Sequence, residues 1–261
     1  MKLQMIGGGK MAEALLGGLV DRGWAAAAEL HVVEPVAERR ALLQTRHPLM
    51  SIGTEPVAET DALIAVKPDV VAAVLGGLAA ARVTRVLSIA AGVRTEVIEQ
   101  QLPAGTAVVR CMPNTPALVG KGAAAIAKGA AAGPDDLDWA AGIMGAVGTV
   151  ELVDESDLDA VTGLSGSGPA YLFHLAEALT AAGIAEGLAP EVADALTRQT
   201  LLGAATLLSE SGEDPAVLRS NVTSPGGTTA AGLAVFAEAD LIALVGKVVQ
   251  AATQRSRELG S

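Results

Sequence analysis

The stretch Ile6-Gly7-Gly8-Gly9-Lys10-Met11-Ala12 decides the fold because of what stands on either side of it. Before it comes a short apolar segment typical of a β-strand, and after it comes a segment whose apolar residues recur every fourth position, as in an amphipathic helix. In that context Gly7 permits a tight turn, Gly9 permits close approach of a pyrophosphate, and Ala12 permits close helix packing. The helix N-terminus adds free N–H groups. The stretch therefore predicts dinucleotide binding, with contacts from Gly7, Gly8, Gly9, Lys10 and Met11.

The alternation of strand and helix continues to about residue 152. The predicted strands are Lys2–Ile6, Leu30–Glu34, Ala62–Val66, Arg85–Ala90, Ala107–Cys111 and Thr149–Val153. Ala- and Leu-rich helical segments separate them, which is typical of parallel strands joined by crossover helices. Residues 1–153 are therefore expected to form an α/β Rossmann domain with a mostly parallel, doubly wound sheet.

Strand patterns stop after Glu151, and helices punctuated by Gly and Pro follow. The predicted helices are Pro169–Gly187, Pro190–Ser209, a short one after Asp214-Pro215, and Asp240–Glu258. An all-α domain of about 100 residues with few large side chains has a thin core of its own. We expect residues 154–261 to form such a domain and to bury apolar surface against a second copy of the chain.

Composition excludes several classes of protein. The chain has 261 residues, 51% of them hydrophobic, and a net charge of -11 from 18 basic and 29 acidic residues, which argues against nucleic-acid binding. One Cys and three scattered His offer no metal-ligand spacing, so no metal site is expected. Charges at Lys10 and Glu13 interrupt the first apolar stretch, and the most apolar uncharged run, Val70 to Ala81, is too short to span a bilayer. We expect a cytoplasmic protein without membrane contact.

Glu34 ends the second predicted strand, where a carboxylate accepts hydrogen bonds from the adenosine ribose hydroxyls. A carboxylate there would repel the extra phosphate of NADP. Arg39 and Arg40 follow at the start of the next helix, and they are either solvated charges or cations that turn toward a 2′-phosphate. The expected cofactor is therefore NADPH, NADH or both.

Three further segments are candidates for ligand contact. Val66-Lys67-Pro68 and the segment from Cys111 to Pro116 follow strands at the expected carboxyl edge of the sheet, where open α/β folds bind ligands. The third, from Val222 to Thr229, places glycines and hydroxyls before a helix, which predicts a backbone nest for a carboxylate. Within these segments Cys111 is better explained as a buried thiol, Lys67 suits a ligand contact or a surface amine equally, and Asn114 could also be a loop cap.

Six segments of the chain resemble the pyrroline-5-carboxylate reductase family, whose members reduce a cyclic imine to proline. The matching segments are Gly7 to Ala12, Val66 to Pro68, Ser88 to Gly92, Met112 to Pro116, Asp159 to Tyr171 and Ser224 to Thr229. The resemblance implies a Rossmann domain, a helical dimerisation domain, and a substrate site where the Ser-Pro-Gly-Gly loop meets the nicotinamide. It also implies cofactor contacts from Val66, Lys67, Pro68, Ala90, Ala91, Gly92, Met112, Pro113 and Asn114. Glu34 departs from family members that carry a Ser or an Asn-Arg pair there.

The chemistry implied by the family can be assigned to residues of the third segment. Ser224 and the N–H groups of Gly226, Gly227 and Thr228 are expected to hold the substrate carboxylate, and the Thr229 hydroxyl is expected to point at the ring nitrogen. The imine can arrive already protonated from solution. A catalytic His or Lys is therefore not required.

Two alternatives remain at this point. A β-hydroxyacid or imine dehydrogenase would share the two-domain plan, but such enzymes place a catalytic Lys on the interdomain helix, and residues 159–187 contain no Lys. A dinucleotide-binding redox sensor without turnover would not need the nest or the segment from Met112 to Pro116.

Overall fold

A computed structural model describes residues 1–260, and the chain divides into two compact units. The first unit comprises Met1–Ser167 together with the residues from Gln250 onward, and the second comprises Gly168–Val249. This division falls later than the expected boundary at residue 153. The reason is that η4 (Glu155–Asp157), α6 (Leu158–Val161) and the π-helical η5 (Thr162–Gly166) follow the last strand within the first unit, where Leu158 packs on Ala125 and Ala127.

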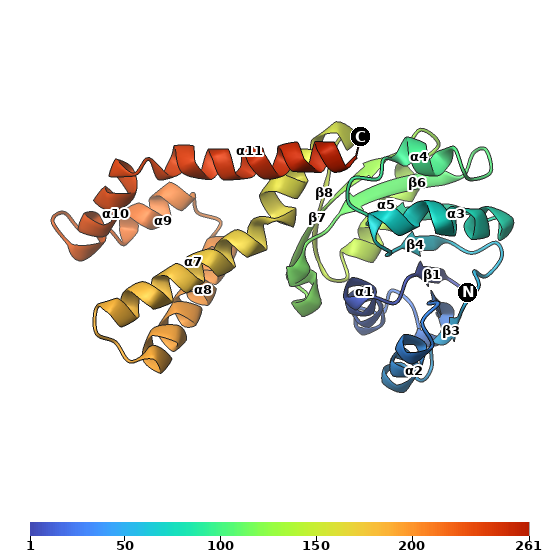
Figure 1. Cartoon of the computed structure of the whole chain (residues 1–261), viewed down its shortest axis with the longest axis horizontal. Helices are drawn as coiled ribbons and strands as arrows, with labels where there is room; N and C mark the ends of the chain where they lie inside the picture. The colour runs from blue at the N-terminus through green and yellow to red at the C-terminus, as the bar shows by residue number, and fades with distance from the viewer. Residues whose placement is uncertain (261) are drawn as a thin grey trace. The chain divides into compact units, whose positions relative to one another are not determined.

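The first unit is built on one eight-stranded sheet with the order β3-β2-β1-β4-β5-β6-β7-β8, drawn in blue to green in Figure 1. Every neighbouring pair is parallel except β6 and β7. The strands are β1 (Leu3–Ile6), β2 (Leu30–Val33), β3 (Ser51–Gly53), β4 (Ala62–Ile64), β5 (Arg85–Ser88), β6 (Ala107–Met112), β7 (Gly122–Lys128) and β8 (Gly148–Leu152). The mostly parallel sheet is as predicted.

Two strands of this sheet were not predicted. β3 has only three residues, all partly or fully exposed, so it lacks an apolar pattern. β7 reads Gly-Ala-Ala-Ala-Ile-Ala-Lys, and alanine has a weak strand preference. Its alanines are nevertheless mostly buried, because β7 lies between β6 and β8. Pairing with β2 decides the conformation of β3, and burial between two strands decides that of β7.

Helices cover both faces of the sheet. On one face, α1 (Lys10–Asp21), α2 (Ala37–Arg46) and α5 (Pro134–Met144) contribute buried side chains such as Leu15, Leu43 and Ile143. On the other face, α3 (Val71–Ala80) and α4 (Thr95–Glu99) contribute Leu75 and Ile98. Short 3-10 turns complete the unit: η1 (Ala27–Glu29), η2 (Pro68–Val70) and η3 (Thr115–Val119). The sheet is therefore doubly wound, as predicted.

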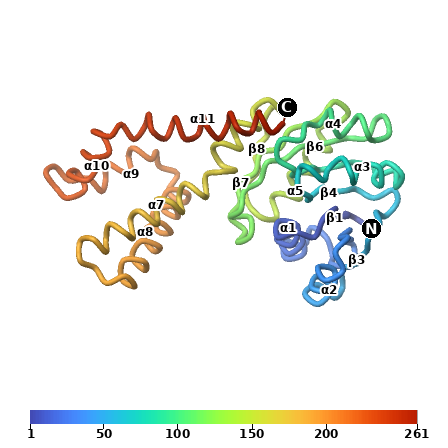
Figure 2. Tube along the Cα trace, viewed as in Figure 1, coloured from blue at the N-terminus to red at the C-terminus, as the bar shows by residue number. Residues whose placement is uncertain are grey.

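The second unit contains only helices among its regular elements. They are α7 (Gly168–Ala185), α8 (Pro190–Ser211), α9 (Pro215–Asn221), α10 (Thr228–Glu238) and the first part of α11 (Leu241–Leu259), drawn in yellow to red in Figure 2. α7 and α8 pack closely at Gly183, where an added Cβ would lie 3.4 Å from Ala193 and from Leu188. Large apolar side chains remain exposed in this unit, among them Phe173 and Ile242. The thin core expected from the sequence is present.

Among residues 1–260, no helix is both long enough and apolar enough to cross a membrane. The same residues contain no group of three or more His, Cys, Asp or Glu side chains placed to hold a metal ion.

Candidate active site

The turn after β1 leaves no room for a side chain. Gly7 has a φ of +98°, and its N–H donates to the carbonyl of Val33 at 2.8 Å. A Cβ at Gly7 would lie 2.8 Å from Cγ1 of Val66 and 2.9 Å from the carbonyl oxygen of Ala65. Any residue other than glycine would therefore be strained here and would collide with the backbone after β4.

The end of this turn opens onto free space. Gly9 is the N-cap of α1, no side chain caps the helix, and a Cβ at Gly9 would meet no protein atom within 4 Å. Ala12 is fully buried, so the first turn of α1 lies close to the sheet. Uncapped N–H groups at an open helix N-terminus suit the pyrophosphate of a dinucleotide. The residues present thus fit a dinucleotide cofactor.

Glu34 is tied to the glycine turn. One of its carboxylate oxygens accepts from the N–H of Gly8 at 2.9 Å, and the other accepts from the N–H of Val36 at 2.9 Å. The residue is only 9% exposed. The carboxylate is therefore fixed beside the turn, and each oxygen retains a lone pair for a further donor.

The two arginines of α2 are already engaged. Arg39 donates to the carbonyl of Gly8 at 2.5 Å and to the Glu13 carboxylate at 2.8 Å. Arg40 donates to the carbonyls of Glu34 and Pro35 at 2.8 and 2.7 Å. Either side chain would have to break these bonds to reach a 2′-phosphate.

Glu13 joins α1 to α2. Its carboxylate accepts from Arg39 and also from Arg46 at 2.7 Å. Burial acts to raise the pKa of Glu13, but the hydrogen bonds to Arg46 and Arg39 outweigh it, and the pKa lies below the ordinary value. Glu13 is therefore ionised at neutral pH and holds both arginines in place.

Three loops meet the glycine turn at one edge of the sheet. They follow β4, β5 and β6, which are parallel to β1, and they contain Val66 to Pro68, Ala90 to Gly92, and Met112 to Asn114. Lys67 is exposed, whereas Ala90 and Gly92 are buried. The fold thus brings the residues of the first unit that the sequence predicts to contact the cofactor to the carboxyl edge, where α/β folds bind ligands.

Asn114 connects the loop after β6 to two other segments. Its side-chain carbonyl accepts from the N–H of Ala123 at 2.8 Å, and its amide donates to the carbonyl of Ser165 at 3.1 Å. The side chain therefore ties the loop after β6 to β7 and to η5. The contact to Ser165, which lies in η5, spans 51 residues and has no signature in the sequence.

Cys111 carries no chemistry in this site. It is 1% exposed within the main core cluster, and burial raises the pKa of its thiol strongly. A thiol that stays protonated is neither a nucleophile nor a base.

The predicted nest lies in the second unit, between α9 and α10. Gly226 has a φ of +68°, and the N–H of Gly227 donates to the carbonyl of Ser224 at 3.0 Å. Gly227 therefore closes the turn and does not offer its N–H to a ligand, which departs from the expectation for that residue. Gly227 is also the N-cap of α10, which has no side-chain cap, so the N–H groups of Thr228 and Thr229 are the first of the helix.

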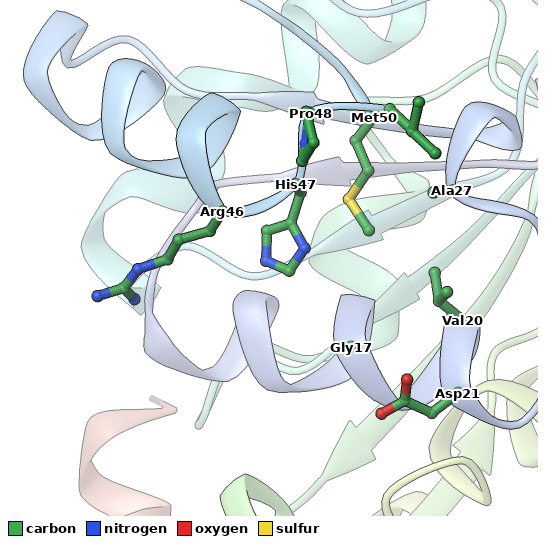
Figure 3. A pocket seen from close by; sticks show the side chains of 9 residues that line it. Gly17, Val20, Asp21, Ala27, Arg46, His47, Pro48 and Met50 are labelled. Atoms are coloured by element: carbon green, nitrogen blue, oxygen red, sulfur yellow. The ribbon is translucent and has the colours of Figure 1, made fainter.

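A separate pocket lies at the other end of α1 (Figure 3). Gly17, Val20 and Asp21 of α1 line it, together with residues from Arg46 to Met50. His47 contributes a buried Nε2 atom that lacks a hydrogen-bond partner and lies 3.8 Å from Glu13. None of the residues predicted to bind cofactor or substrate lines this pocket, so it is not the candidate site.

The fold and the open glycine turn define a dinucleotide-dependent oxidoreductase. Residues 2–92 match the family described as NADP oxidoreductase, coenzyme F420-dependent, and residues 155–259 match the pyrroline-5-carboxylate reductase dimerisation domain. A pyrroline-5-carboxylate reductase from Synechocystis is 44% identical over 100% of this chain and 98% of its own length. The chain belongs to the pyrroline-5-carboxylate reductase family.

Solved structures agree with this assignment. A pyrroline-5-carboxylate reductase from Coxiella burnetii is 34% identical, with a TM-score of 0.92 over 100% of this chain and 98% of its own. The Plasmodium falciparum enzyme, solved with NADP bound, is 28% identical, with a TM-score of 0.84 over 100% of this chain and 98% of its own. Family membership argues against both alternatives considered above, the β-hydroxyacid or imine dehydrogenase and the redox sensor.

We predict that Asn114→Ala lowers stability, because it leaves the Ala123 N–H and the Ser165 carbonyl without their partner. An unsatisfied buried group costs about 1–3 kcal/mol, and each kcal/mol lowers the thermal midpoint by about 2–4 °C in a chain of this size. Calorimetry measures the midpoint, with the exposed Gln101→Ala as the matched control, expected to change it little. An unchanged midpoint for Asn114→Ala would show that these contacts do not stabilise the first unit.

Proposed function

We propose that the chain reduces 1-pyrroline-5-carboxylate to L-proline with NADH or NADPH, the last step of proline biosynthesis. One observation supports the proposal most directly. This member of the family has two helix N-termini without a side-chain cap, at the glycine turn of the first unit and at the nest of the second, and both suit anions. The first suits the cofactor pyrophosphate and the second suits the substrate carboxylate.

The residues of the first unit hold the cofactor. The N–H groups at the start of α1 bind the pyrophosphate, Glu34 accepts from the adenosine ribose, and the loops after β4, β5 and β6 enclose the nicotinamide end. Lys10 and Met11 occupy the first turn of α1, and the exposed Lys67 contacts cofactor charge. The reduced nicotinamide, when bound, supplies a hydride to the carbon of the C=N bond.

The residues of the nest hold the substrate. The Ser224 hydroxyl and the N–H groups of Gly226 and Thr228 bind the carboxylate. The Thr229 hydroxyl donates to the ring nitrogen as hydride transfer places a lone pair on that nitrogen. As the hydride adds to carbon, the electron pair of the C=N bond moves to nitrogen. A proton that the imine already carries from solution stays on this nitrogen, so no strong acid is needed from the protein.

The assembly we propose is a homodimer made through the second unit. Exposed apolar side chains occur along its helices, including Phe173 at 64% exposure and Ile242 at 87%. A monomer rarely leaves so many large apolar groups in water. A second copy of the same domain is the occupant that the dimerisation family describes.

We predict that the dimer is obligate. Obligate interfaces bury upward of about 2,000 Å² in total. We expect that the second unit, with its thin core, does not remain folded without this burial. Sedimentation at low micromolar concentration, with activity measured on the same samples, should give only dimers or larger species. A stable, folded and active monomer would refute this prediction.

We predict that NADH is used at least as well as NADPH, because the fixed Glu34 carboxylate repels a 2′-phosphate and both nearby arginines are engaged. Two like unit charges 4 Å apart cost about 4 kcal/mol at an effective dielectric constant of 20, before screening by salt. Initial rates with each cofactor, with and without pyrroline-5-carboxylate, test both the turnover and the preference. Glu34→Gln keeps an acceptor for the Gly8 N–H. It should raise the rate with NADPH and leave the rate with NADH little changed. A preference of the parent for NADPH above about tenfold, or 1.4 kcal/mol, would contradict the role of Glu34.

We predict that Thr229→Val lowers turnover by about 10- to 100-fold, because it removes the donor to the ring nitrogen while preserving the branched shape. Steady-state kinetics, cofactor affinity and the thermal midpoint are compared with those of Thr206→Val, an exposed hydroxyl of α8 outside the nest. The control should retain full activity. Turnover within about twofold of the parent, or a matching loss of cofactor affinity, would rule out the assigned role.

A further inference from the structure

Besides the pocket at the end of α1, the first unit contains a cavity of ≈ 360 Å³ that is lined by polar and charged residues. It includes none of the residues assigned to cofactor or substrate. It is lined by Arg94, Arg110, Glu155, Ser156, Asp159 and Arg257. These residues come from the loop before α4, from β6, from the η4 and α6 segment, and from the last turns of α11. Four separate segments therefore converge on one cavity.

Arg110 is a buried cation with few partners. It is 5% exposed, and the one hydrogen bond of its side chain within residues 1–260 runs to Glu155 at 3.3 Å, which is long for such a bond. A guanidinium group carries five N–H donors. A buried charge needs acceptors for such donors, so the cavity it lines favours an occupant with acceptor oxygens.

The carboxylates of the cavity already have other partners. Glu155 also accepts from the N–H of Thr95 at 2.8 Å and from its hydroxyl at 2.7 Å. Asp159 accepts from the hydroxyl of Ser256 at 2.6 Å. Both carboxylates are thus engaged with other groups, and in the described residues neither pairs with Arg94 or Arg257.

Arg94 and Arg257 supply the excess positive charge. Both are exposed, and in the described part of the chain neither side chain forms a hydrogen bond or ion pair. Three guanidinium groups thus face two carboxylates in a chain whose net charge is -11. A cavity of this charge attracts anions locally, against the repulsion of the whole molecule.

We propose that this cavity binds a small oxyanion with two negative charges, a phosphate or a dicarboxylate, held between Arg94, Arg257 and Arg110. Guanidinium groups pair with both kinds of oxyanion in a fork geometry. The volume of the cavity suits a ligand of a few heavy atoms and is small for a nucleotide.

The bound anion also joins two segments of the first unit. The last residues of α11 pack on the loop after β5: a Cβ at Gly92 would lie 3.3 Å from the carbonyl oxygen of Leu259. Arg257 lies on that part of α11, and Arg94 follows Gly92 by two residues. An anion between the two arginines therefore fastens the end of α11 to the loop that carries Ala90, Ala91 and Gly92, and its binding raises the thermal midpoint.

The test is isothermal titration of inorganic phosphate, and separately of succinate, into the full-length enzyme saturated with reduced cofactor at constant ionic strength. Saturation with cofactor occupies the glycine turn, the other phosphate site of this unit. The variant is Arg94→Gln with Arg257→Gln, and the matched control is Arg255→Gln, which removes one charge from the same helix but pairs with Glu258 outside the cavity. The thermal midpoint without added anion checks that each variant is folded.

We expect one saturable site for at least one anion, weakened at least about tenfold in the double variant and changed less than about twofold in the control, where tenfold equals 1.4 kcal/mol. Tighter binding of phosphate or of succinate identifies which oxyanion the cavity prefers. No saturable heat with either anion, or equal affinity in the double variant, would overturn the proposal. Turnover of pyrroline-5-carboxylate is measured on the same proteins, so that a failure of anion binding can be told apart from a failure of the reductase assignment.

Discussion

The fold depends on a turn after β1 that has no space for a side chain. Gly7 adopts a left-handed conformation, and its neighbours are the backbone of Ala65 and the side chain of Val66 at the end of β4. Because β1 is the central partner of both β2 and β4, a bulkier residue at Gly7 would push apart the strands that define the carboxyl edge. The spacing of the sheet and the exposure of the α1 N-terminus therefore have a common cause.

Glu34 extends this constraint to the side of the turn where we propose that the adenosine ribose binds. Its carboxylate accepts the N–H of Gly8, so the group that should discriminate between cofactors also fixes the shape of the turn. Arg39 reaches the same turn through the carbonyl of Gly8 and is held by Glu13, whose pKa the arginines lower. Loop shape and charge are thus coupled through a small number of hydrogen bonds. A substitution at Glu34 has to keep an acceptor if its electrostatic effect is to be read separately from its structural one.

The sequence predicted the parts of this structure that depend on local pattern. The strand, glycine turn and amphipathic helix are adjacent in the chain, so their relation follows from spacing and periodicity. It did not predict β7, because buried alanines between two strands look the same in sequence as alanines in a helix. Nor did it predict the bond from Asn114 to Ser165 or the convergence of Arg94, Arg110 and Arg257, which join distant segments. Gly227 shows the limit most clearly: its place in a nest was predicted from composition, but the use of its N–H within the turn depends on the backbone dihedral angles.

The way this acidic chain binds anions follows from the same geometry. The dinucleotide carries phosphates and the proposed substrate carries a carboxylate, whereas the whole protein has a net charge of -11. The two sites proposed for them use backbone N–H groups at helix N-termini, which provide positive potential without a titrating side chain. Cys111 stays protonated because of its burial, so it adds no ionisation to the site. In the mechanism we propose, ionisation of the imine itself, and not of a protein acid, then links the rate of reduction to pH.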